Sequence, residues 1–573
     1  MGRRVRRAAR ALILASGQPV RETGWAARTS WFVALPDVEA AGVIAARIEA
    51  EHEICYPSGR PFVLARGAEV AIDARDRLRV VLGEAGSVHV LEVVDGHVRV
   101  RGTASGLRRV FHARVNGLGI ASDRADVLAG LAGAGPDPLG IALRLLSPEA
   151  PWPLAWHSVW SGVAAVPPGH WVDLASGRFD RWWTPPEPEL ALADAAVALR
   201  EALADAVRIR QQGKAKVACD LSGLDSSSLF GLAVRGGPVV ALTHQADDPM
   251  DEDVAAAQYL AEHFGAEHDV LAAEQAPLPF DGVDGSLFDE PTWVSAYRSR
   301  IGTASARAAK YGAELRFAGH GGDELLMPPP VWLADVARRH PLRAARLARR
   351  VQAKYRLTAG AVAGLLADRT TYADWFATSL ERKQSTEMHV LGWGVPPQLP
   401  HWLTGHAVEL VRGAFAEAAE PLAEARGMHA TLEFVHTGAL AARHVAQLGE
   451  VDGVPVASPF FDDRVLEACL AVRPDEAIDP RRYKPLLVQA MADVLPPRAL
   501  ARASKSDISM TVSKGWSEHR RGLLALLEDS GTAQLGLIDV DAVRRICRGP
   551  YDVDTCGPVR RLLEVEAWLK GLR

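Results

Sequence analysis

Residues 217–233 read VACDLSGLDSSSLFGLA, a short apolar strand that passes through a turn of Ser, Gly and Asp into a helix. A carboxylate among so many small donors is costly to bury unless a positive group, most simply a metal ion, lies beside it. Backbone N–H groups at such a turn and at the start of the following helix favour anions such as phosphate. Turns of this composition are common between strands and helices, so the stretch needs support from the rest of the chain.

That support comes from two further stretches that predict strands. VVALTH at 239–244 precedes a helical pattern closed by Gly265, and ELRFAGHGGDELL at 314–326 predicts a strand over residues 315–318. The stripe that the intervening helix is expected to bury comprises Val254, Ala257, Ala261 and Phe264.

The third stretch ends in a glycine-rich turn that carries Asp323 and Glu324. Ligands of open α/β sheets bind beyond the carboxyl ends of the strands, so Asp225 and Asp323 are expected to meet over one pocket. Two carboxylates with open coordination positions suit Mg²⁺ bridging to phosphate oxygens. The chain contains no Walker A lysine pattern, so the site predicted is that of a nucleotide triphosphate outside the P-loop class.

Composition limits the classes of protein and partner. A chain of 573 residues predicts more than one domain, and 24% charged residues with a net charge of −5 give no general attraction to nucleic acid or membrane. The five cysteines lack metal-ligand spacing, which favours neither a disulfide framework nor a zinc site and fits a reducing cytoplasm. No apolar run is long enough to span a bilayer.

The pattern divides the chain into three parts. Residues 1–29 form a basic extension with three open interpretations: a weak amphipathic helix, a disordered arm, or a start codon placed too far upstream; we favour the last two. Residues 30–190 alternate apolar and polar positions between Gly and Asn-Gly turns, which predicts β-hairpins. Residues 191–573 alternate helices with short strands, which predicts an α/β sheet domain with a helical C-terminal part.

Several motifs in order carry a family resemblance. LSGLDSSS (221–228) resembles the pyrophosphate loop of the asparagine synthetase superfamily of ATP pyrophosphatases, and AGHGGDELL (318–326) resembles its second metal-carrying loop. ASPFFDD (457–463) and the segment YKPLLVQAMADVLPPRALARASK (483–505) are similar to its later motifs. The resemblance implies a degenerate glutaminase-like α+β domain over 30–190, then an ATP-pyrophosphatase domain like those of the adenine nucleotide alpha hydrolases over 191–573.

The resemblance also implies ATP and Mg²⁺ as cofactors and a role for each motif residue. Asp225 and Asp323 would hold the metal. Lys505 would lie against the phosphates and the anionic intermediate, and Lys484 would neutralise the departing pyrophosphate. Lys505 ranks above Lys484 because Arg502 stands near it in the matching pattern. The residues expected to bind the nucleotide are Leu221, Ser222, Gly223, Leu224, Asp225, Ser226, Ser227, Thr243, Gly319, Gly321 and Gly322.

Two departures from the family pattern matter. The pyrophosphate loop usually has two adjacent glycines, whereas Gly223 stands alone, so its exact phosphate donors are open. The chain also opens with Met1-Gly2-Arg3 rather than a cysteine, and its first cysteine is Cys55. Since this class of amidotransferase uses an N-terminal cysteine as nucleophile, glutamine is not expected to be the nitrogen source.

SWFVALPD (30–37), YPSGRPFVLARG (56–67) and DEPTW (289–293) resemble lasso-peptide cyclases. This implies that a leader-free core peptide is closed into a macrolactam with release of AMP and pyrophosphate, in a pathway with a leader peptidase and a leader-recognition protein. A β-lactam synthetase-like or ammonia-dependent asparagine synthetase-like ligase is the alternative within the superfamily. A non-catalytic scaffold that binds ATP or peptide is the alternative of another class.

Overall fold

The computed structural model describes residues 31–34, 53–54, 62–65, 68–72, 78–84, 86–94, 97–248, 250–382, 392–477, 481–502, 509–547 and 553–573. It contains two compact units. The first comprises residues 1–140 and 156–184, and the second comprises residues 141–155 and 185–573. The predicted extension 1–29 lies outside the described residues.

The first unit is built on two antiparallel sheets, one with the order β10-β8-β9-β1-β3-β2 and the other with the order β12-β11-β7-β6-β5-β4. The strands are β1 (Trp31–Ala34), β2 (Glu53–Ile54), β3 (Phe62–Ala65), β4 (Ala68–Ile72), β5 (Leu78–Glu84), β6 (Ser87–Val94), β7 (His97–Arg101), β8 (Phe111–Val115), β9 (Leu118–Ser122), β10 (Val163–Ala165), β11 (His170–Asp173) and β12 (Phe179–Arg181). Helix α3 (Ala125–Ala132) follows β9, and α4 (Pro138–Arg144) runs on into the second unit.

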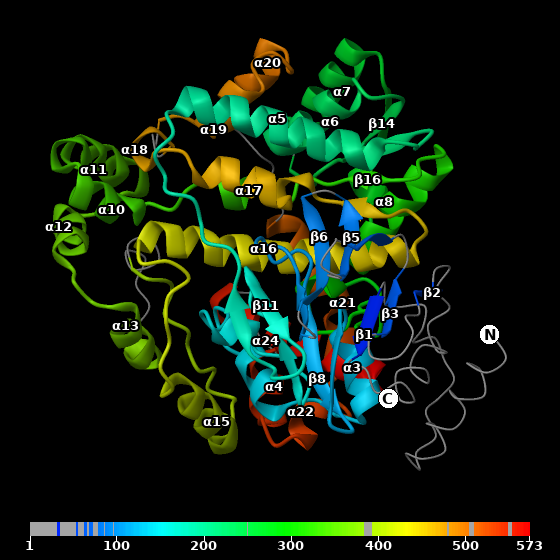
Figure 1. Ribbon diagram of the computed structural model, residues 1–573, viewed down its shortest axis with the longest axis vertical. Coiled ribbons are helices and arrows are strands. Elements are labelled where there is room, and N and C mark those ends of the chain that lie inside the picture. Colours follow the sequence, from blue (N-terminus) through cyan, green and yellow to red (C-terminus); the bar gives the residue numbers. More distant parts are fainter. Residues whose placement is uncertain are drawn as a thin grey trace. The chain divides into compact units, whose positions relative to one another are not determined.

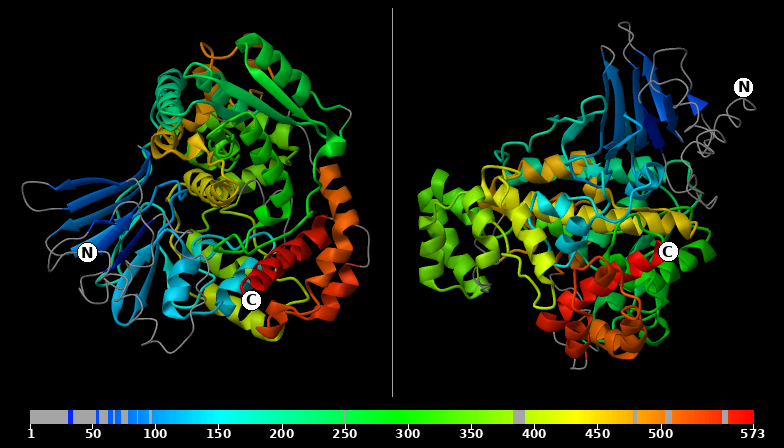
Figure 2. Two further views of the ribbon diagram at one scale, coloured as in Figure 1. Left: turned by 90° about the vertical axis from the view of Figure 1, so that its right-hand side faces the viewer. Right: turned by 90° about the horizontal axis from the view of Figure 1, so that it is seen from below.

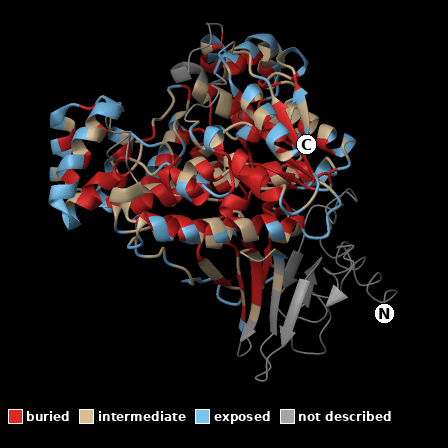
Figure 3. Cartoon of the chain, turned by 90° about the horizontal axis from the view of Figure 1, so that it is seen from above, coloured by how far each residue is buried: buried red, intermediate tan, exposed pale blue. Residues whose placement is uncertain are grey.

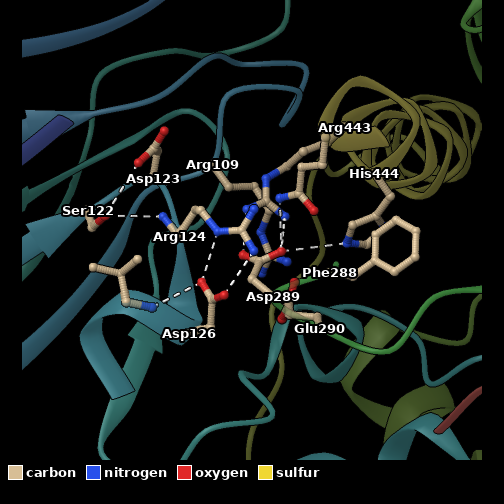
Figure 4. Close-up of polar contacts among 12 residues, drawn as sticks. Arg109, Ser122, Asp123, Arg124, Asp126, Phe288, Asp289, Glu290, Arg443 and His444 are labelled. Carbon is tan, nitrogen blue, oxygen red and sulfur yellow. Dashed lines mark hydrogen bonds and ion pairs between the residues drawn. The ribbon is translucent and has the colours of Figure 1, made fainter. Parts of the chain in front are cut away.

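The hairpin predicted from the Asn-Gly pair is confirmed. Asn116 and Gly117 join β8 to β9 with φ angles of 51° and 83°, the left-handed values that a two-residue hairpin turn requires. Directly after β9, the buried guanidinium of Arg124 donates to both oxygens of Asp126 at 2.9 and 2.8 Å (Figure 4). This pair satisfies two charged groups that would otherwise be costly to bury.

A five-stranded parallel sheet organises the second unit, in the order β15-β14-β13-β16-β17. Figure 1 labels two of its strands, β14 and β16. Its strands are β13 (Val217–Asp220), β14 (Val239–His244), β15 (Glu267–Leu271), β16 (Arg316–Phe317) and β17 (Val456–Ala457). The strand predicted at 239–244 is confirmed in full, whereas the one predicted at 315–318 is a two-residue strand. Two of these parallel strands, β13 and β16, are neighbours, so the turns that follow them meet at one edge.

Helices pack against this sheet: α6 and α8 contact its central strands, α7 contacts β14 and β15, and α16 contacts β17. The α-helices of the second unit that follow α4 are α5 (Leu192–Gln211), α6 (Leu224–Ala233), α7 (Asp253–Phe264), α8 (Arg298–Lys310), α9 (Gly322–Leu326), α10 (Trp332–Arg339), α11 (Pro341–Tyr355), α12 (Ala359–Ala367), α13 (Tyr372–Thr378), α15 (Gly405–Phe415), α16 (Arg426–Val451), α17 (Asp463–Leu470), α18 (Pro474–Ala477), α19 (Pro485–Ala490), α20 (Pro497–Leu500), α21 (Ser509–Ala525), α22 (Gly531–Gln534), α23 (Val540–Ile546) and α24 (Val553–Gly571). Figure 2 shows the long helix α16 nearly end-on in its left view, with other helices of the unit around it.

The predicted stripe of α7 is correct at Ala257 and Ala261, which are buried together with Leu260. Gly265 ends the helix with a φ of 65° and donates to the carbonyl of Ala261, as a glycine cap does. The helices of the second unit differ in how far they are buried. Helix α16 is largely buried, whereas α11 and α12 are exposed along most of their outer faces (Figure 3). Among the described helices, none has the length and apolar character needed to cross a bilayer.

Candidate functional site

The turn between β13 and α6 folds back on itself through hydroxyl groups. The Ser222 N–H donates to Ser226 Oγ at 3.0 Å, and the hydroxyls of Ser226 and Ser227 donate to the Gly223 carbonyl at 3.0 and 2.8 Å. Gly223 has a φ of −84°, and a Cβ built on it would meet nothing within 4 Å. At Gly223 itself, the turn therefore requires neither a left-handed backbone nor the absence of a side chain.

Thr243 supports the same turn from the neighbouring strand. Its buried hydroxyl donates to the Leu221 carbonyl at 2.9 Å and lies 2.9 Å from His268 Nε2. The Leu221 N–H in turn donates to the Leu242 carbonyl at 2.8 Å. The sequence predicted Thr243 as a nucleotide-binding residue, and the structure gives its side chain contacts within the protein that fix the end of β13.

The glycine-rich turn after β16 packs directly against Asp225. A Cβ added to Gly322 would lie 2.2 Å from Asp225 Cγ, and one added to Gly319 would lie 3.4 Å from Asp225 Cβ. Gly321 has a φ of 98°, and its Cβ would lie 2.7 Å from Phe460. The first two glycines leave room for the carboxylate, and the third provides a left-handed backbone that other residues rarely adopt.

Asp225 and Asp323 meet as predicted, and the group between them is Lys484. The Lys484 ammonium lies 2.5 Å from Asp225 Oδ2 and 2.6 Å from Asp323 Oδ1, and its side chain is 0% exposed. Lys484 has a φ of 41° although it directly precedes Pro485, a position where this conformation is disfavoured. The surrounding packing thus holds a strained backbone that directs the ammonium between the two carboxylates.

Electrostatics in this cluster favour the charged ammonium. Burial lowers the pKa of Lys484, but the charges and hydrogen bonds of Asp225 and Asp323 outweigh it and leave the pKa above its ordinary value. Tyr483 lies beside this lysine, and burial raises its pKa against the opposing charge of Lys484. A neutral phenol and a charged ammonium therefore stand next to the two carboxylates at neutral pH.

Glu324 completes the acidic side of the site. It accepts a hydrogen bond from the Gly321 N–H at 3.1 Å, which closes the glycine-rich turn. Burial, reinforced by the charges of Asp323 and Asp225, raises the pKa of Glu324. A Cβ on Gly438 of α16 would lie 2.3 Å from Glu324 Oε1, so this glycine allows the helix to approach the carboxylate.

The residues at this edge fit a divalent cation bound with phosphate. Two carboxylate oxygens converge on one cationic nitrogen, which marks a position where positive charge is stabilised. Carboxylate oxygens are the ligands that Mg²⁺ takes, usually one or two of them with substrate phosphates completing the shell. Asp225 and Asp323 would hold the ion, with Glu324 beside them.

Arg502 holds the turn between β13 and α6 in place. Its guanidinium donates to the Ser222 carbonyl at 2.5 Å and forms an ion pair with Asp253 at the start of α7. This contact links the turn to a second helix and gives Arg502 a positioning role in the structure. Lys505, which the sequence ranks above Lys484, lies outside the described residues.

One further group of possible metal ligands, Asp289, Glu290 and His444, has ligand atoms within 4.8 Å of one another in the part of the chain that the structure describes. Asp289 accepts hydrogen bonds from both terminal nitrogens of the Arg443 guanidinium, at 2.9 and 2.5 Å (Figure 4). A bidentate guanidinium already neutralises this buried carboxylate. The group is therefore an internal ion-pair cluster.

The basic run at 337–350 forms the end of α10 and most of α11. Arg339 pairs with Glu187 at 3.2 Å, and Arg343 pairs with Asp475 at 2.8 Å. These arginines lie at an exposed helix face and have acidic partners from distant segments. Two arginines of this run are therefore already ion-paired within the protein.

The sequence interpretation missed two residues of the site. Gly438 interrupts the interior of a helix, where glycine is unfavourable, and such a glycine is a signal of close packing. Tyr483 had no signal beyond its place next to Lys484, because its role depends on how the chain packs around the two carboxylates.

Comparison with known proteins agrees with this geometry. Residues 198–570 match the asparagine synthase family, a span that covers more than half of the chain. No curated protein matches the sequence. The matched span includes both acidic turns and Lys484, the groups that meet at the edge of the sheet. The chain therefore belongs to the asparagine synthase family, whose members are ATP-dependent carbon–nitrogen ligases that release AMP.

Proposed function

We propose that this amide ligase closes a peptide into a macrolactam by joining the N-terminal amine of a leader-free core peptide to an internal Asp or Glu side chain. The observation that carries the activation step is the convergence of Asp225 and Asp323 on Lys484 at the ends of adjacent parallel strands. The peptide substrate rests on the likeness of residues 30–37, 56–67 and 289–293 to lasso-peptide cyclases.

The activation step requires a carboxylate oxygen of the peptide to attack the α-phosphorus of ATP, with pyrophosphate as the leaving group. Bound Mg²⁺ supplies positive charge to the phosphate oxygens in this step. The N–H groups of the turn at Gly223 and of the start of α6 would bind phosphate. Lys484, already fixed beside the two carboxylates, would neutralise charge on the departing pyrophosphate.

Ring closure follows when the α-amine attacks the acyl-adenylate carbonyl and AMP leaves with the electron pair of the broken C–O bond. An α-amine has a pKa of about 7.7–8.0, so an appreciable fraction is neutral near pH 7. Catalysis of ring closure therefore requires little assistance in removing a proton from the amine. The larger requirement is to hold the two reacting groups of the peptide together.

The product provides the direct test. With ATP, Mg²⁺ and a core peptide, we expect AMP and pyrophosphate to form in step with a peptide that is lighter by one water. Tandem mass spectrometry should place a ring between the first residue and an internal carboxylate. Replacing that internal acid by its amide should stop both pyrophosphate release and ring closure, because an amide cannot be adenylated.

Acetylation of the peptide's α-amine separates the two half-reactions. ATP–pyrophosphate exchange should persist with this peptide while ring formation ceases, and added glutamine should not raise turnover. Formation of free asparagine or of a small β-lactam would show that the enzyme is the corresponding ligase and would contradict the proposed cyclase activity. Binding of ATP and peptide without exchange would indicate a non-catalytic scaffold.

Gly322→Ala tests the packing of the site. Its Cβ would lie 2.2 Å from Asp225 Cγ, so the carboxylate has to move. We expect pyrophosphate release to fall about a hundredfold or more, because a displacement near 1 Å in a reacting site has an effect of this order. The matched control is Gly413→Ala, where the new Cβ meets nothing within 4 Å. A Gly322→Ala enzyme as active as the control would contradict the described fit of Asp225.

A further inference from the structure

A pocket with a volume of about 90 Å³ lies along α16 within the second unit. It is lined by residues of α4, the segment 149–155, the segment 291–293, α16 and α24. The lining of this α16 pocket combines arginines and glutamates with an apolar wall. Its apolar members include Leu143, Leu440, Ala441, Val565 and Trp293.

One carboxylate oxygen in the α16 pocket is buried without a hydrogen bond. Glu564 is 6% exposed, and its Oε1 has no hydrogen-bond partner in the described structure. It forms an ion pair at 3.5 Å with the Nε of Arg560, which is also buried without a hydrogen bond in the described structure. Because buried polar atoms without hydrogen bonds are unfavourable, the pair favours a ligand that accepts from Arg560 Nε–H and donates to Glu564 Oε1.

The charges of the α16 pocket alternate in sign. Arg561 lies 3.4 Å from Glu149, and Arg144 lies 3.7 Å from Glu290, which is outside the lining, so each guanidinium has a loosely placed acidic partner. Burial raises the pKa of Glu564 to about 7, although Arg560 and Arg561 oppose the shift. A cationic ligand would meet three arginines and an anionic one would meet the glutamates, so a neutral group with donors and acceptors fits best.

The apolar wall selects among neutral groups. A volume of about 90 Å³ corresponds to about three water molecules or one small aliphatic side chain. Trp293 is 40% exposed at the pocket and offers a large apolar surface to an incoming group. A peptide unit combines such a side chain with an amide that both donates and accepts.

Helix α16 connects this pocket to the catalytic edge. Gly438 packs against Glu324, and the preceding residue, Thr437, lines the α16 pocket. The pocket continues to His444, which lies six residues beyond Gly438 and thus about 9 Å further along the helix at 1.5 Å per residue.

We infer that the α16 pocket is a subsite for the peptide substrate and binds a neutral amide of the core peptide together with an adjoining aliphatic side chain. The identity of the substrate as a peptide rests on the proposed function. The binding chemistry rests on Glu564, the alternating charges and the apolar wall, and can be tested without turnover.

The binding test uses three leucine derivatives of different charge: N-acetyl-leucine N-methylamide, which is neutral; N-acetyl-leucine, an anion that lacks the methylamide; and leucine N-methylamide, a cation that lacks the acetyl group. In saturation-transfer NMR with the full chain, we expect transfer to the neutral probe to exceed transfer to either charged probe. Thr437→Trp places an indole at the exposed edge of the pocket and should reduce that transfer at least about fivefold. Val451→Trp, at the exposed end of the same helix and outside the pocket, should leave it unchanged.

Equal transfer in wild type and Thr437→Trp would overturn the inference, and so would preferred transfer to a charged probe or no transfer at all. The kinetic counterpart is the KM for core peptide, expected to rise about tenfold in Thr437→Trp while kcat and the KM for ATP stay constant. If the wild-type protein does not turn over a core peptide, the proposed function fails. The three probes still decide the chemistry of the pocket in that case.

Discussion

Asp225→Asn and Asp323→Asn are each expected to slow Mg²⁺-dependent pyrophosphate release by about a thousandfold. Each change removes one of the two carboxylates that converge on a single cationic position at the sheet edge. A group that anchors charge on a transferring phosphate commonly contributes several kcal/mol to the barrier, and each 1.36 kcal/mol is a factor of ten. Initial rates of pyrophosphate release at saturating ATP measure the effect.

Asn is the appropriate replacement because it keeps the size of the side chain and removes only its charge. Asp493→Asn is the matched control: Asp493 pairs with Arg200 at the surface and its side chain is 81% exposed. We expect that control to stay within about twofold of wild type, since exposed ion pairs contribute little. Near-normal rates in both site variants would show that these carboxylates have no role in the reaction.

The stretches that the sequence predicts well are those whose physics is local. Strand 239–244 and the cap at Gly265 follow from hydrophobic period and turn chemistry. The meeting of Asp225 and Asp323 followed from one general rule, that turns at the carboxyl ends of neighbouring parallel strands share an edge. Each of these predictions uses residues close in sequence or a fixed topology.

The position of Lys484 has a different origin. It is 259 residues from Asp225 and 161 from Asp323 in sequence, so no local pattern places it between them. The sequence interpretation ranked Lys505 higher because Arg502 stands near it, whereas the structure uses Arg502 to hold Ser222 and Asp253. Such contacts depend on how α19 and the segment after α20 pack against the sheet, which a single sequence does not reveal.

The partners of the basic run illustrate the same limit. Six arginines in 337–350 suggest a ligand-attracting surface when read alone. Glu187 and Asp475 lie far away in sequence, and each neutralises one of these arginines in the fold. A run of arginines along a helix therefore predicts an exposed face, but it does not by itself predict a ligand-binding surface. The acidic residues that neutralise the arginines come from distant parts of the sequence.

Lys484→Met is expected to impair activity and stability together. The ammonium is fully buried between Asp225 and Asp323, so its loss leaves two facing carboxylates without their counter-charge. Removing one member of a buried charge cluster destabilises by about 3–5 kcal/mol. Burial lowers the pKa of Lys484, but the two aspartates keep it above the ordinary value. The stabilisation is therefore fully present at pH 7 and is lost only as pH rises through the folded-state pKa.

Urea unfolding at pH 7 and pyrophosphate release separate the two effects when a further variant is included. Lys484→Met combined with Asp225→Asn and Asp323→Asn removes all three charges of the buried cluster together, so we expect it to recover much of the lost stability. It should remain inactive, because neither the metal ligands nor the cation is present. If Lys484→Met alone keeps both the stability and the rate of wild type, the ammonium has no role between the carboxylates. If it loses stability but keeps its rate, Lys484 is a structural counter-ion, and charge on the departing pyrophosphate must be neutralised by another group.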